Sequence, residues 1–346
     1  MSEDVLLVKT SSMGDVLHML PAVSDLRRLR PELRLWWLVE ENLAMIPSWH
    51  PGVARVLPVA LRRWRGQPWQ AWRSGEVGRF LTGLRATRFR QIIDAQGLLK
   101  SALLAGLARG PVTGPAADWA RERWALPCYR QRVEVQAGWH VVTRLRHLLA
   151  QGVGYACPQT PADFGLDAAR LPALAPGIPE PFVVLLHGTA WPSKVWPEDY
   201  WGALGRLIGR GWSGAMLLPW GSGAEQARAQ HLAAAIGPAA RVLPRLGLAE
   251  LAAVLARARA VVGLDSGLAH LAGVLQRPCV TLFGATNPDY SGIGGPRQRL
   301  LRAAWPCAPC MQRRCAAAPV AGIHPPCTRT LPPERVWDEL RPLLEE

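Results

Sequence analysis

The chain of 346 residues is 49% hydrophobic and 19% charged, which supplies apolar side chains for about two packed domains and excludes a largely disordered protein. Lys and Arg number 40 against 26 Asp and Glu, so the net charge is +14, and only three of the basic residues are lysines. Because arginine pairs well with phosphates and carboxylates, this surplus favours a nucleic acid, an anionic membrane or a phosphorylated substrate as partner. Charge alone does not choose among the three.

The N-terminus shows no targeting signal, since its first residues, MSEDV, are acidic and no apolar segment of the secretory type follows them. The most apolar short run, residues 182–186, is far below the roughly 18 residues that cross a bilayer. We therefore expect a soluble, cytoplasmic protein.

In the first half, apolar runs alternate with amphipathic segments, the pattern of βαβ units and a parallel sheet. A helix is expected over residues 16–30, with a kink or a restart at Pro21. The expected strands cover residues 5–8, 34–39, 53–59 and 91–94.

A segment rich in Pro, Ala and Gly, residues 152–181, separates this half from a second half with the same alternation. Its expected strands are residues 182–186, 215–218, 241–243, 260–264 and 279–283, and its expected helices are residues 198–210, 224–236, 249–258, 268–275 and 334–344. The sequence thus predicts an α/β protein with two doubly wound domains that bind a ligand at the carboxyl ends of their strands. The domains are expected over residues 1–165 and 181–330, with a linker over 166–180 and a C-terminal helix within 331–346.

The first strand-to-helix turn, VKTSSMGD at residues 8–15, brings small residues and Gly14 to a helix N-terminus, where backbone amides bind anions. Asp15 stands at its edge and is either a helix cap or a catalytic carboxylate. The turn has neither GxGxxG spacing nor a Walker lysine, so it does not indicate a dinucleotide or NTPase site.

The second turn, VVGLDSGLAH at residues 261–270, offers Ser266 and Gly267 amides to a diphosphate and Asp265 to a sugar hydroxyl. Alternatively, Ser266 or Asp265 caps the helix, and packing alone satisfies His270. Two further loops carry Lys194, a candidate phosphate ligand or a solvated lysine, and Glu225, a candidate ribose ligand or a helix-stabilising acid.

These motifs resemble glycosyltransferase family 9, the ADP-heptose-using heptosyltransferases, and within it the heptosyltransferase I branch. The similarity runs through LLVKTSSMGDVLHMLPAVSDL, WLVEENLAMIPSWHPGVARVLPVALRRWR and IIDAQGLLKSALL, then LLHGTAWPSKVWP, LPWGSGAE and DSGLAHLAGVLQRPCVTLFGATNP. It covers about residues 4–290 and implies a GT-B fold of two Rossmann-like domains, the first binding the acceptor and the second the nucleotide-sugar. The implied reaction is inverting, metal-independent transfer of L-glycero-D-manno-heptose from ADP-heptose to Kdo of Kdo2-lipid A, without a cofactor.

The resemblance also assigns roles to individual residues. It implies that Asp15 is the general base and that the donor contacts Thr189, Lys194, Glu225, Asp265, Ser266, Gly267 and His270. A structural role is the alternative for His270. For the acceptor it implies Ser12, Gly14, Lys100, Arg121 and the loop residues Arg62, Arg63 and Arg65, whose alternative is an ordinary solvated face. Domain closure would bring Asp15 to the donor, at the inner face of the inner membrane, against which the protein would make peripheral contact.

Four of the seven cysteines, Cys307, Cys310, Cys315 and Cys327, crowd into 21 residues. We expect free or redox-linked thiols here, and a structural zinc ion, which the spacing would also suit, is the alternative.

Two other functions are compatible with the residues. A paralogue of the heptosyltransferase II type, which adds a later heptose or another sugar to a different acceptor, would keep the donor motifs and differ around residues 61–65 and 100–125. A non-enzymatic protein that binds nucleic acid or a membrane surface would need only the arginines. The motif interpretation favours the enzyme, with no nucleic-acid partner.

Overall fold

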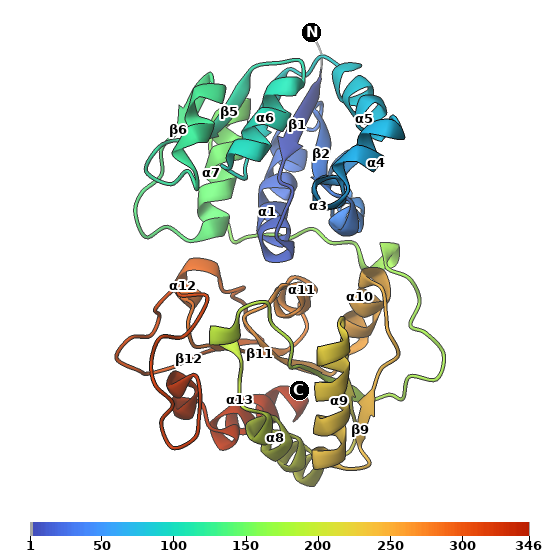
Figure 1. Cartoon of the computed structure of the whole chain (residues 1–346), viewed down its shortest axis with the longest axis vertical. Helices are drawn as coiled ribbons and strands as arrows, with labels where there is room; N and C mark the ends of the chain where they lie inside the picture. Colours follow the sequence, from blue (N-terminus) through green and yellow to red (C-terminus); the bar gives the residue numbers. More distant parts are fainter. Residues whose placement is uncertain (1–2, 346) are drawn as a thin grey trace. The chain divides into compact units, whose positions relative to one another are not determined.

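The structure, a computed structural model, describes residues 3–345. The chain divides into two compact units, residues 1–167 and 168–346. Each unit is a parallel six-stranded sheet with helices against it (Figure 1). The predicted α/β class with two doubly wound domains is confirmed.

In the first unit the strand order is β3-β2-β1-β4-β5-β6, and every pairing is parallel. The chain runs outward from β1 to β3, returns to β4 beside β1, and then runs outward in the other direction, which creates a switch point between β1 and β4. Its strands are β1 (Asp4–Val8), β2 (Arg34–Glu40), β3 (Val53–Val59), β4 (Gln91–Asp94), β5 (Val112–Pro115) and β6 (Gln131–Val133); its helices are α1 (Met13–Leu29), α2 (Met45–Ser48), α3 (Leu61–Gly66), α4 (Pro68–Arg73), α5 (Glu76–Arg85), α6 (Leu99–Leu107) and α7 (Val141–Val153).

The second unit repeats this topology with strand order β12-β11-β10-β7-β8-β9, so its switch point lies between β7 and β10. The last helix, α13, belongs to this unit and packs against α8, with Val336 and Leu340 in the core. The strands are β7 (Phe182–Leu186), β8 (Ala215–Leu218), β9 (Ala240–Val242), β10 (Ala260–Leu264), β11 (Cys279–Phe283) and β12 (Gln298–Arg302); the helices are α8 (Glu198–Gly211), α9 (Gly223–Ile236), α10 (Leu248–Arg257), α11 (Gly267–Val274), α12 (Pro288–Ser291) and α13 (Pro333–Glu345).

Central strands of both sheets are buried on both faces, which explains why their sequences are continuous apolar runs and were predictable. Along β1, successive side chains alternate between the faces, and Leu6 and Val8 pack with Ala102 and Ala105 of α6 in one core. No helix among residues 3–345 has the length and apolarity that crossing a membrane requires.

Three local predictions were wrong. Helix α1 begins at Met13, not residue 16, and is a single helix that contains Pro21, so it does not restart there. Arg62, Arg63 and Arg65 lie on the short helix α3, not in a loop. Helix α7 continues to Val153, so the segment rich in Pro and Gly is irregular only beyond it.

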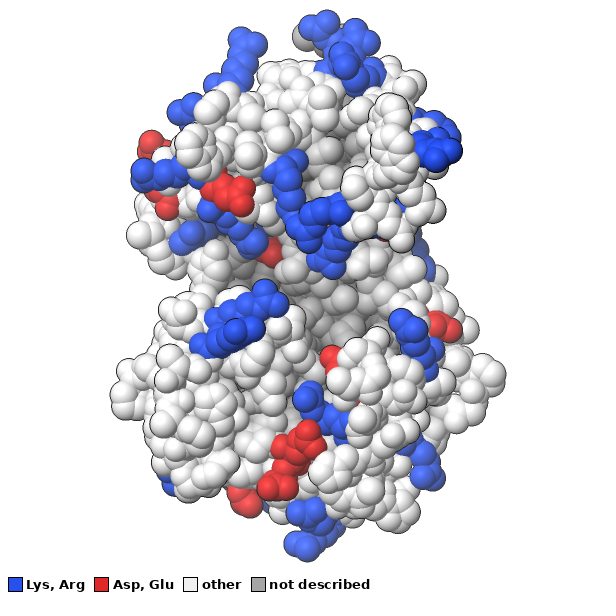
Figure 2. Space-filling model, viewed as in Figure 1, with Lys and Arg blue, Asp and Glu red and all other residues white. Residues whose placement is uncertain are grey.

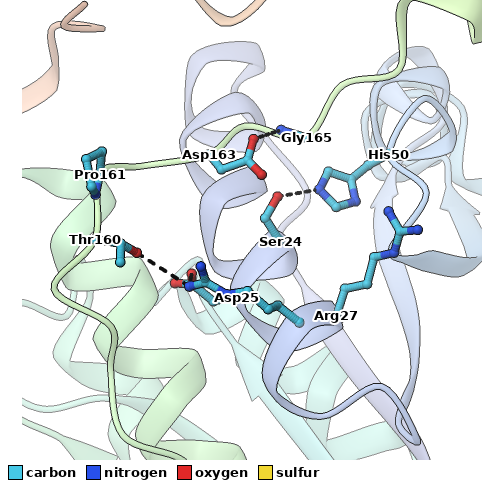
Figure 3. Close-up of a pocket in the computed structure, with 9 residues that line it drawn as sticks. Ser24, Asp25, Arg27, His50, Thr160, Pro161, Asp163 and Gly165 are labelled. Atoms are coloured by element: carbon cyan, nitrogen blue, oxygen red, sulfur yellow. Dashed lines mark hydrogen bonds and ion pairs between the residues drawn. The ribbon is translucent and has the colours of Figure 1, made fainter.

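A cavity of about 280 Å³ in the first unit lies where the segment around residues 160–165 passes over α1 (Figure 3). Beside it, Asp25 of α1 binds the buried guanidinium of Arg146, at 2.6 Å from Oδ2 to Nε, and Arg146 also donates to the Thr160 carbonyl. The ring of His50 accepts from the Gly52 amide through Nδ1, so its Nε2 donates to the Ser24 hydroxyl, 2.9 Å away. Ser24 is therefore not activated as a nucleophile.

We expect Asp25→Ala to lower the free energy of unfolding by about 3–5 kcal/mol, because it leaves the buried Arg146 guanidinium without its counter-ion. Urea denaturation followed by circular dichroism measures this change. The matched control is Glu32→Ala, which removes the exposed Arg30–Glu32 pair, 2.6 Å apart, and should change stability little. Equal effects of the two substitutions would contradict the burial argument.

Candidate active site

Most of the predicted site residues follow strands at the switch points, where neighbouring helices diverge and leave room for a ligand. In the first unit they follow β1, with Arg121 after β5 and Lys100 on α6 after β4. In the second unit they follow β7, β8 and β10. The structure brings some of them together in two clusters, one in each unit, and leaves others apart.

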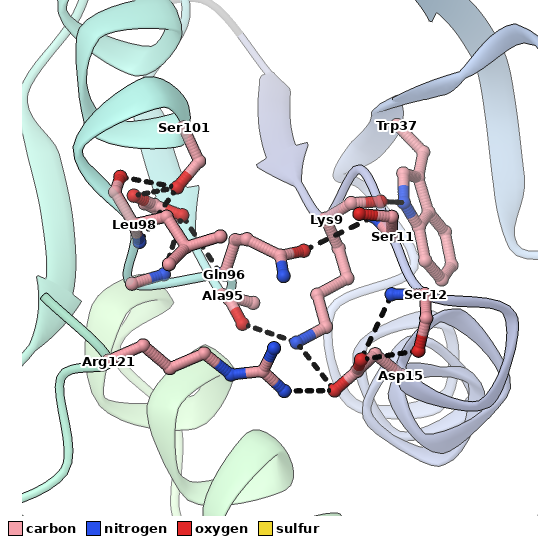
Figure 4. A network of polar contacts seen from close by, with 12 residues as sticks. Lys9, Ser11, Ser12, Asp15, Trp37, Ala95, Gln96, Leu98, Ser101 and Arg121 are labelled. Atoms are coloured by element: carbon pink, nitrogen blue, oxygen red, sulfur yellow. Dashed lines mark hydrogen bonds and ion pairs between the residues drawn. The ribbon is translucent and has the colours of Figure 1, made fainter. Parts of the chain in front are cut away.

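The Asp15 cluster consists of Lys9, Ser12, Asp15 and Arg121 (Figure 4). One carboxylate oxygen of Asp15 accepts from the Ser12 amide at 2.9 Å and from the Ser12 hydroxyl at 2.8 Å. The other oxygen lies 2.6 Å from the Arg121 guanidinium and 3.6 Å from Lys9 Nζ. Ser12 is the N-cap of α1 with Asp15 at N3, so the carboxylate is both part of a capping box and the counter-ion of two cations.

The loop that carries these groups is fixed by contacts to two other strands. Trp37 of β2 donates to the Lys9 carbonyl at 3.1 Å, and the Ser11 amide donates to Gln96, just after β4, at 3.2 Å. Lys9 itself is only 3% exposed and donates to the Ala95 carbonyl at 2.8 Å. These contacts therefore fix the cluster at the carboxyl end of the central strand β1, with Gly14 in the first turn of α1 beside it.

Burial raises the pKa of Asp15, but the charges of Lys9 and Arg121 and the hydrogen bonds from Ser12 outweigh it and bring the pKa well below its usual range. Asp15 is therefore ionised at neutral pH. The ionised carboxylate is the form that can accept a proton from a bound hydroxyl, while the two cations that lower its pKa also weaken it as a base.

The other predicted acceptor residues of the first unit are not part of this cluster. Arg62 and Arg65 are exposed on α3, and Lys100 is exposed on α6. Arg63 binds Glu41 at 2.9 Å and Glu76 at 2.6 Å, so its fork is already occupied by two carboxylates. Those bonds raise the pKa of Arg63 above its usual value.

The Asp265 cluster consists of Lys194, Asp265, His270 and Thr286. One oxygen of Asp265 lies 2.6 Å from both Lys194 Nζ and the Thr286 hydroxyl. The other oxygen lies 2.9 Å from His270 Nε2. His270 is thus held by a carboxylate, not by packing alone.

Burial raises the pKa of Asp265, but the hydrogen bond and charge of His270, together with Lys194, lower it well below its ordinary range. Ser266 is the N-cap of α11, and its hydroxyl accepts from the Ala269 amide at 3.4 Å, which leaves the first amides of the helix available for an anion. Gly267 is the first residue of that helix.

Glu225 lies at N3 of α9 and accepts from the Gly221 amide at 2.8 Å, in a capping box with Ser222. Its other oxygen lies against Gly188, where a Cβ would approach within 2.6 Å. This contact brings Glu225 next to the loop after β7 that carries Thr189. His187 in the same loop is buried, and burial together with the Arg228 charge lowers its pKa to about 4, so its ring is neutral at pH 7.

Comparison with known proteins identifies the family. The glycosyltransferase family 9 (heptosyltransferase) model matches residues 77–321. The chain belongs to glycosyltransferase family 9. It is a glycosyltransferase, as the motif resemblance predicted.

Curated heptosyltransferases resemble this glycosyltransferase along most of its length. The lipopolysaccharide heptosyltransferase 1 of Pseudomonas aeruginosa is 48% identical over 98% of each chain. That of Escherichia coli K12 is 42% identical over 86% of this chain and 93% of its own.

Solved structures agree with the fold. Escherichia coli heptosyltransferase WaaC with ADP matches with a TM-score of 0.80 and 41% identity, covering 87% of this chain and 93% of that one. The same enzyme with ADP-2-deoxy-2-fluoro heptose matches with a TM-score of 0.81 and 37% identity, over 98% and 99% of the two chains. The glycosyltransferase therefore has the GT-B fold.

The sequence interpretation missed two members of the clusters, Lys9 and Thr286. Lys9 is one of only three lysines and directly follows a buried strand, so its rarity and position could have identified it. Thr286 follows β11 in the same way, but nothing in its residue type indicates that it binds Asp265.

The structure does not assemble the proposed zinc site. Among residues 3–345, no group of three or more His, Cys, Asp or Glu side chains is arranged to hold a metal ion, and Cys307, Cys310, Cys315 and Cys327 are free thiols. The segment that carries them is instead attached to the glycosyltransferase loops beside the Asp265 cluster. The Ser193 hydroxyl donates to the Gln312 carbonyl at 2.6 Å, and the Met311 amide donates to the Ala285 carbonyl at 2.7 Å.

Proposed function

We propose that this enzyme transfers L-glycero-D-manno-heptose from ADP-heptose to a Kdo residue of Kdo2-lipid A, at the inner face of the inner membrane. Heptose transfer in lipopolysaccharide core synthesis follows from its family and from its identity to the curated relatives. The choice of Kdo2-lipid A as acceptor is supported by the share of this chain that aligns with heptosyltransferase 1 rather than with heptosyltransferase 2. Heptosyltransferase 1 of Pseudomonas aeruginosa aligns over 98% of this chain, whereas heptosyltransferase 2 of Salmonella typhimurium aligns over 41% at 27% identity.

In this proposal the second unit binds the donor. The Lys194 ammonium and the amides of Ser266 and Gly267 bind the diphosphate, because a compact cation and a helix N-terminus both stabilise anionic oxygens. Asp265 accepts from heptose hydroxyls, and His270 and Thr286 orient its carboxylate. Glu225 accepts from the ribose hydroxyls, with Thr189 beside it.

The first unit binds the acceptor, and Asp15 is the general base. The acceptor hydroxyl oxygen forms a bond to the anomeric carbon of heptose on the face opposite ADP, and the bond from that carbon to the phosphate oxygen breaks. Asp15 takes the hydroxyl proton, and ADP leaves with the electron pair. A single displacement inverts the anomeric configuration.

The leaving diphosphate gains negative charge as its bond to heptose breaks. Lys194 and the α11 amides stabilise that charge in the transition state more than in the ground state, which is the requirement for catalysis. These groups supply the electrostatic role of a divalent ion, so the proposed mechanism is metal-independent.

For the acceptor we propose Ser12, Gly14 and Arg121 close to the reacting hydroxyl, and Arg62, Arg65 and Lys100 at its phosphates and carboxylates. Arg63 takes part only if an acceptor carboxylate or phosphate replaces Glu41 or Glu76. Arg121 is half exposed, so an acidic sugar has access to its remaining donors.

The acceptor assignment predicts that ADP-heptose and Kdo2-lipid A give a singly heptosylated product, whereas heptosylated Kdo2-lipid A gives no further transfer. Mass spectrometry of the two reactions measures this difference. Preferential transfer to the heptosylated acceptor would identify the enzyme as a heptosyltransferase II type instead. Salt-sensitive RNA binding with no transfer to either acceptor would favour the non-enzymatic alternative.

We expect Asp15→Asn to lower kcat by about 10²- to 10⁴-fold, because the amide cannot accept the hydroxyl proton. Binding of ADP-heptose, measured by calorimetry, should be unchanged, since the proposed donor ligands all lie in the other unit.

The matched control is Asp118→Asn, which neutralises an exposed carboxylate of the same unit. Wild-type turnover in Asp15→Asn would refute the base assignment. A parallel loss in the control would trace the effect to net charge.

Arg121→Gln should shift the acidic limb of the kcat/KM profile to higher pH. Burial raises the Asp15 pKa while Lys9 and Arg121 lower it, so loss of the Arg121 charge lets the pKa rise and Asp15 is protonated at higher pH. Rates measured with a water-dispersed acceptor test this shift. The control Arg123→Gln removes an exposed arginine two residues away and should leave the limb in place; equal shifts would contradict the specific pairing.

A further inference from the structure

The first unit exposes large apolar side chains on α4, on α6 and on the short 3-10 helix Arg123–Cys128. Trp69 is 66% exposed, Trp72 69% and Trp124 79%. Leu99, Leu103 and Leu107 of α6 are 38%, 53% and 41% exposed. These six side chains form what we call the docking face.

The three leucines form a continuous line along α6, because residues four apart lie on the same side of a helix. The opposite side of α6 is also apolar, with Ala102, Leu104 and Ala105 buried in the core. A surface helix normally has a polar outer side. The outer side of α6 therefore offers an apolar surface to a partner.

Trp69 and Trp72 lie three residues apart on α4 and stack, with ring centroids 5.6 Å apart. Stacked indoles form a wide apolar plate, while each ring N–H still binds water or a polar headgroup. Tryptophan with this double character is enriched where proteins meet the boundary between lipid headgroups and acyl chains.

The elements of the docking face belong to one part of the unit. Helix α5 packs against both α4 and α6, and α6 packs against the helix that carries Trp124. Figure 1 shows α4 and α5 side by side on this unit.

The surrounding surface is strongly basic. Residues 61–109 contain nine arginines and one lysine but only two acids, of which Asp94 is buried and Glu76 is bonded to Arg63. One exposed acid outside this range, Glu122, accepts from the Leu99 amide at the edge of the docking face. Arg73, Arg79 and Arg85 of α4 and α5 are exposed. Basic side chains are spread over the visible face of this unit in Figure 2.

We propose that the docking face binds the surface of an anionic lipid bilayer, with its Trp and Leu side chains in the headgroup and acyl boundary and the arginines on lipid phosphates. Apolar insertion and basic attraction are the two terms that hold interfacial helices on membranes, and this face supplies both. The +10 and −2 charges of residues 61–109 favour a uniformly anionic partner over a second copy of this basic chain. This proposal is argued from the surface itself and deepens the proposed function, which places the enzyme at the inner face of the inner membrane, by naming the residues that meet the lipids.

The test is co-sedimentation of the full chain with vesicles of phosphatidylglycerol and phosphatidylethanolamine, compared with phosphatidylcholine vesicles. We expect binding to the anionic vesicles that weakens as salt rises. Two variants remove the apolar term separately: Leu103→Ser with Leu107→Ser, and Trp69→Ser with Trp72→Ser. Each should weaken partitioning about tenfold or more.

The matched control is Leu29→Ser, which changes an exposed leucine (41%) on α1, a helix that pairs with α7. It should bind vesicles like the wild type. The triple variant Arg73→Gln, Arg79→Gln and Arg85→Gln should weaken binding to anionic vesicles and reduce its salt dependence. Because all these side chains are exposed, the variants should keep the wild-type melting temperature.

Vesicle binding by the docking-face variants equal to that of the control would overturn the proposal. So would a wild-type dimer, seen by light scattering, that the Leu or Trp variants dissociate without changing vesicle binding. A water-dispersed acceptor separates this proposal from the catalytic one. If the docking face acts on membranes, the variants lose transfer to acceptor in vesicles and keep transfer to the dispersed acceptor. Absence of any transfer would instead count against the proposed function. The vesicle-binding data would still decide whether the docking face binds membranes.

Discussion

An aspartate held ionised beside a lysine occurs in each unit, partly shielded at Asp15 (14% exposed) and buried at Asp265 (6%), and the geometry of both clusters depends on it. Lys9 lies 3.6 Å from Asp15, and Lys194 lies 2.6 Å from Asp265. Removing two charges from water costs more than their attraction usually returns, so such pairs are poor devices for stability alone. Each carboxylate is further bonded by a hydroxyl, from Ser12 and from Thr286. The pairs are therefore best explained by chemistry that needs a charged carboxylate in a fixed direction.

Topology places both pairs. In each sheet the order in which the chain adds strands reverses once, between β1 and β4 or between β7 and β10. At that point the helices leave on opposite faces of the sheet. Lys9 and Asp15 follow β1, and Asp265 follows β10 while Lys194 follows β7. Backbone contacts from neighbouring strands then fix the loops, as Trp37 and Gln96 do for residues 9–11. The same strand order therefore places a lysine–aspartate pair near the switch point of both sheets.

The sequence predicted those parts of the fold where burial of apolar side chains alone decides which residues occur. Strands buried on both faces, such as Phe182–Leu186 and Cys279–Phe283, are recognisable because burial dictates their residues. The prediction failed where burial competes with the local preferences of the residues. Three strands were missed, because they are short or contain Gly, Pro or Arg and have no apolar run: β5, β6 and β12. In α1, burial of the surrounding residues in the core compensates for Pro21. The motif prediction named Asp15, Arg121 and Asp265, but it missed Thr286, which approaches Asp265 from a distant segment that only tertiary packing brings there.

The distribution of the cations follows from the size of their charged groups. All but three of the 40 basic residues are arginines, yet two of the three lysines occupy the two clusters. A compact ammonium fits between a carboxylate and a backbone carbonyl, as Lys9 does with Ala95 and Lys194 with the Asp265 carbonyl. A planar guanidinium needs more room and is less costly at a surface, where its fork holds carboxylates or phosphates. In the two clusters lysine therefore supplies the charge next to the carboxylate, whereas the exposed arginines can meet an anionic partner from outside; Arg146, buried against Asp25, is an exception.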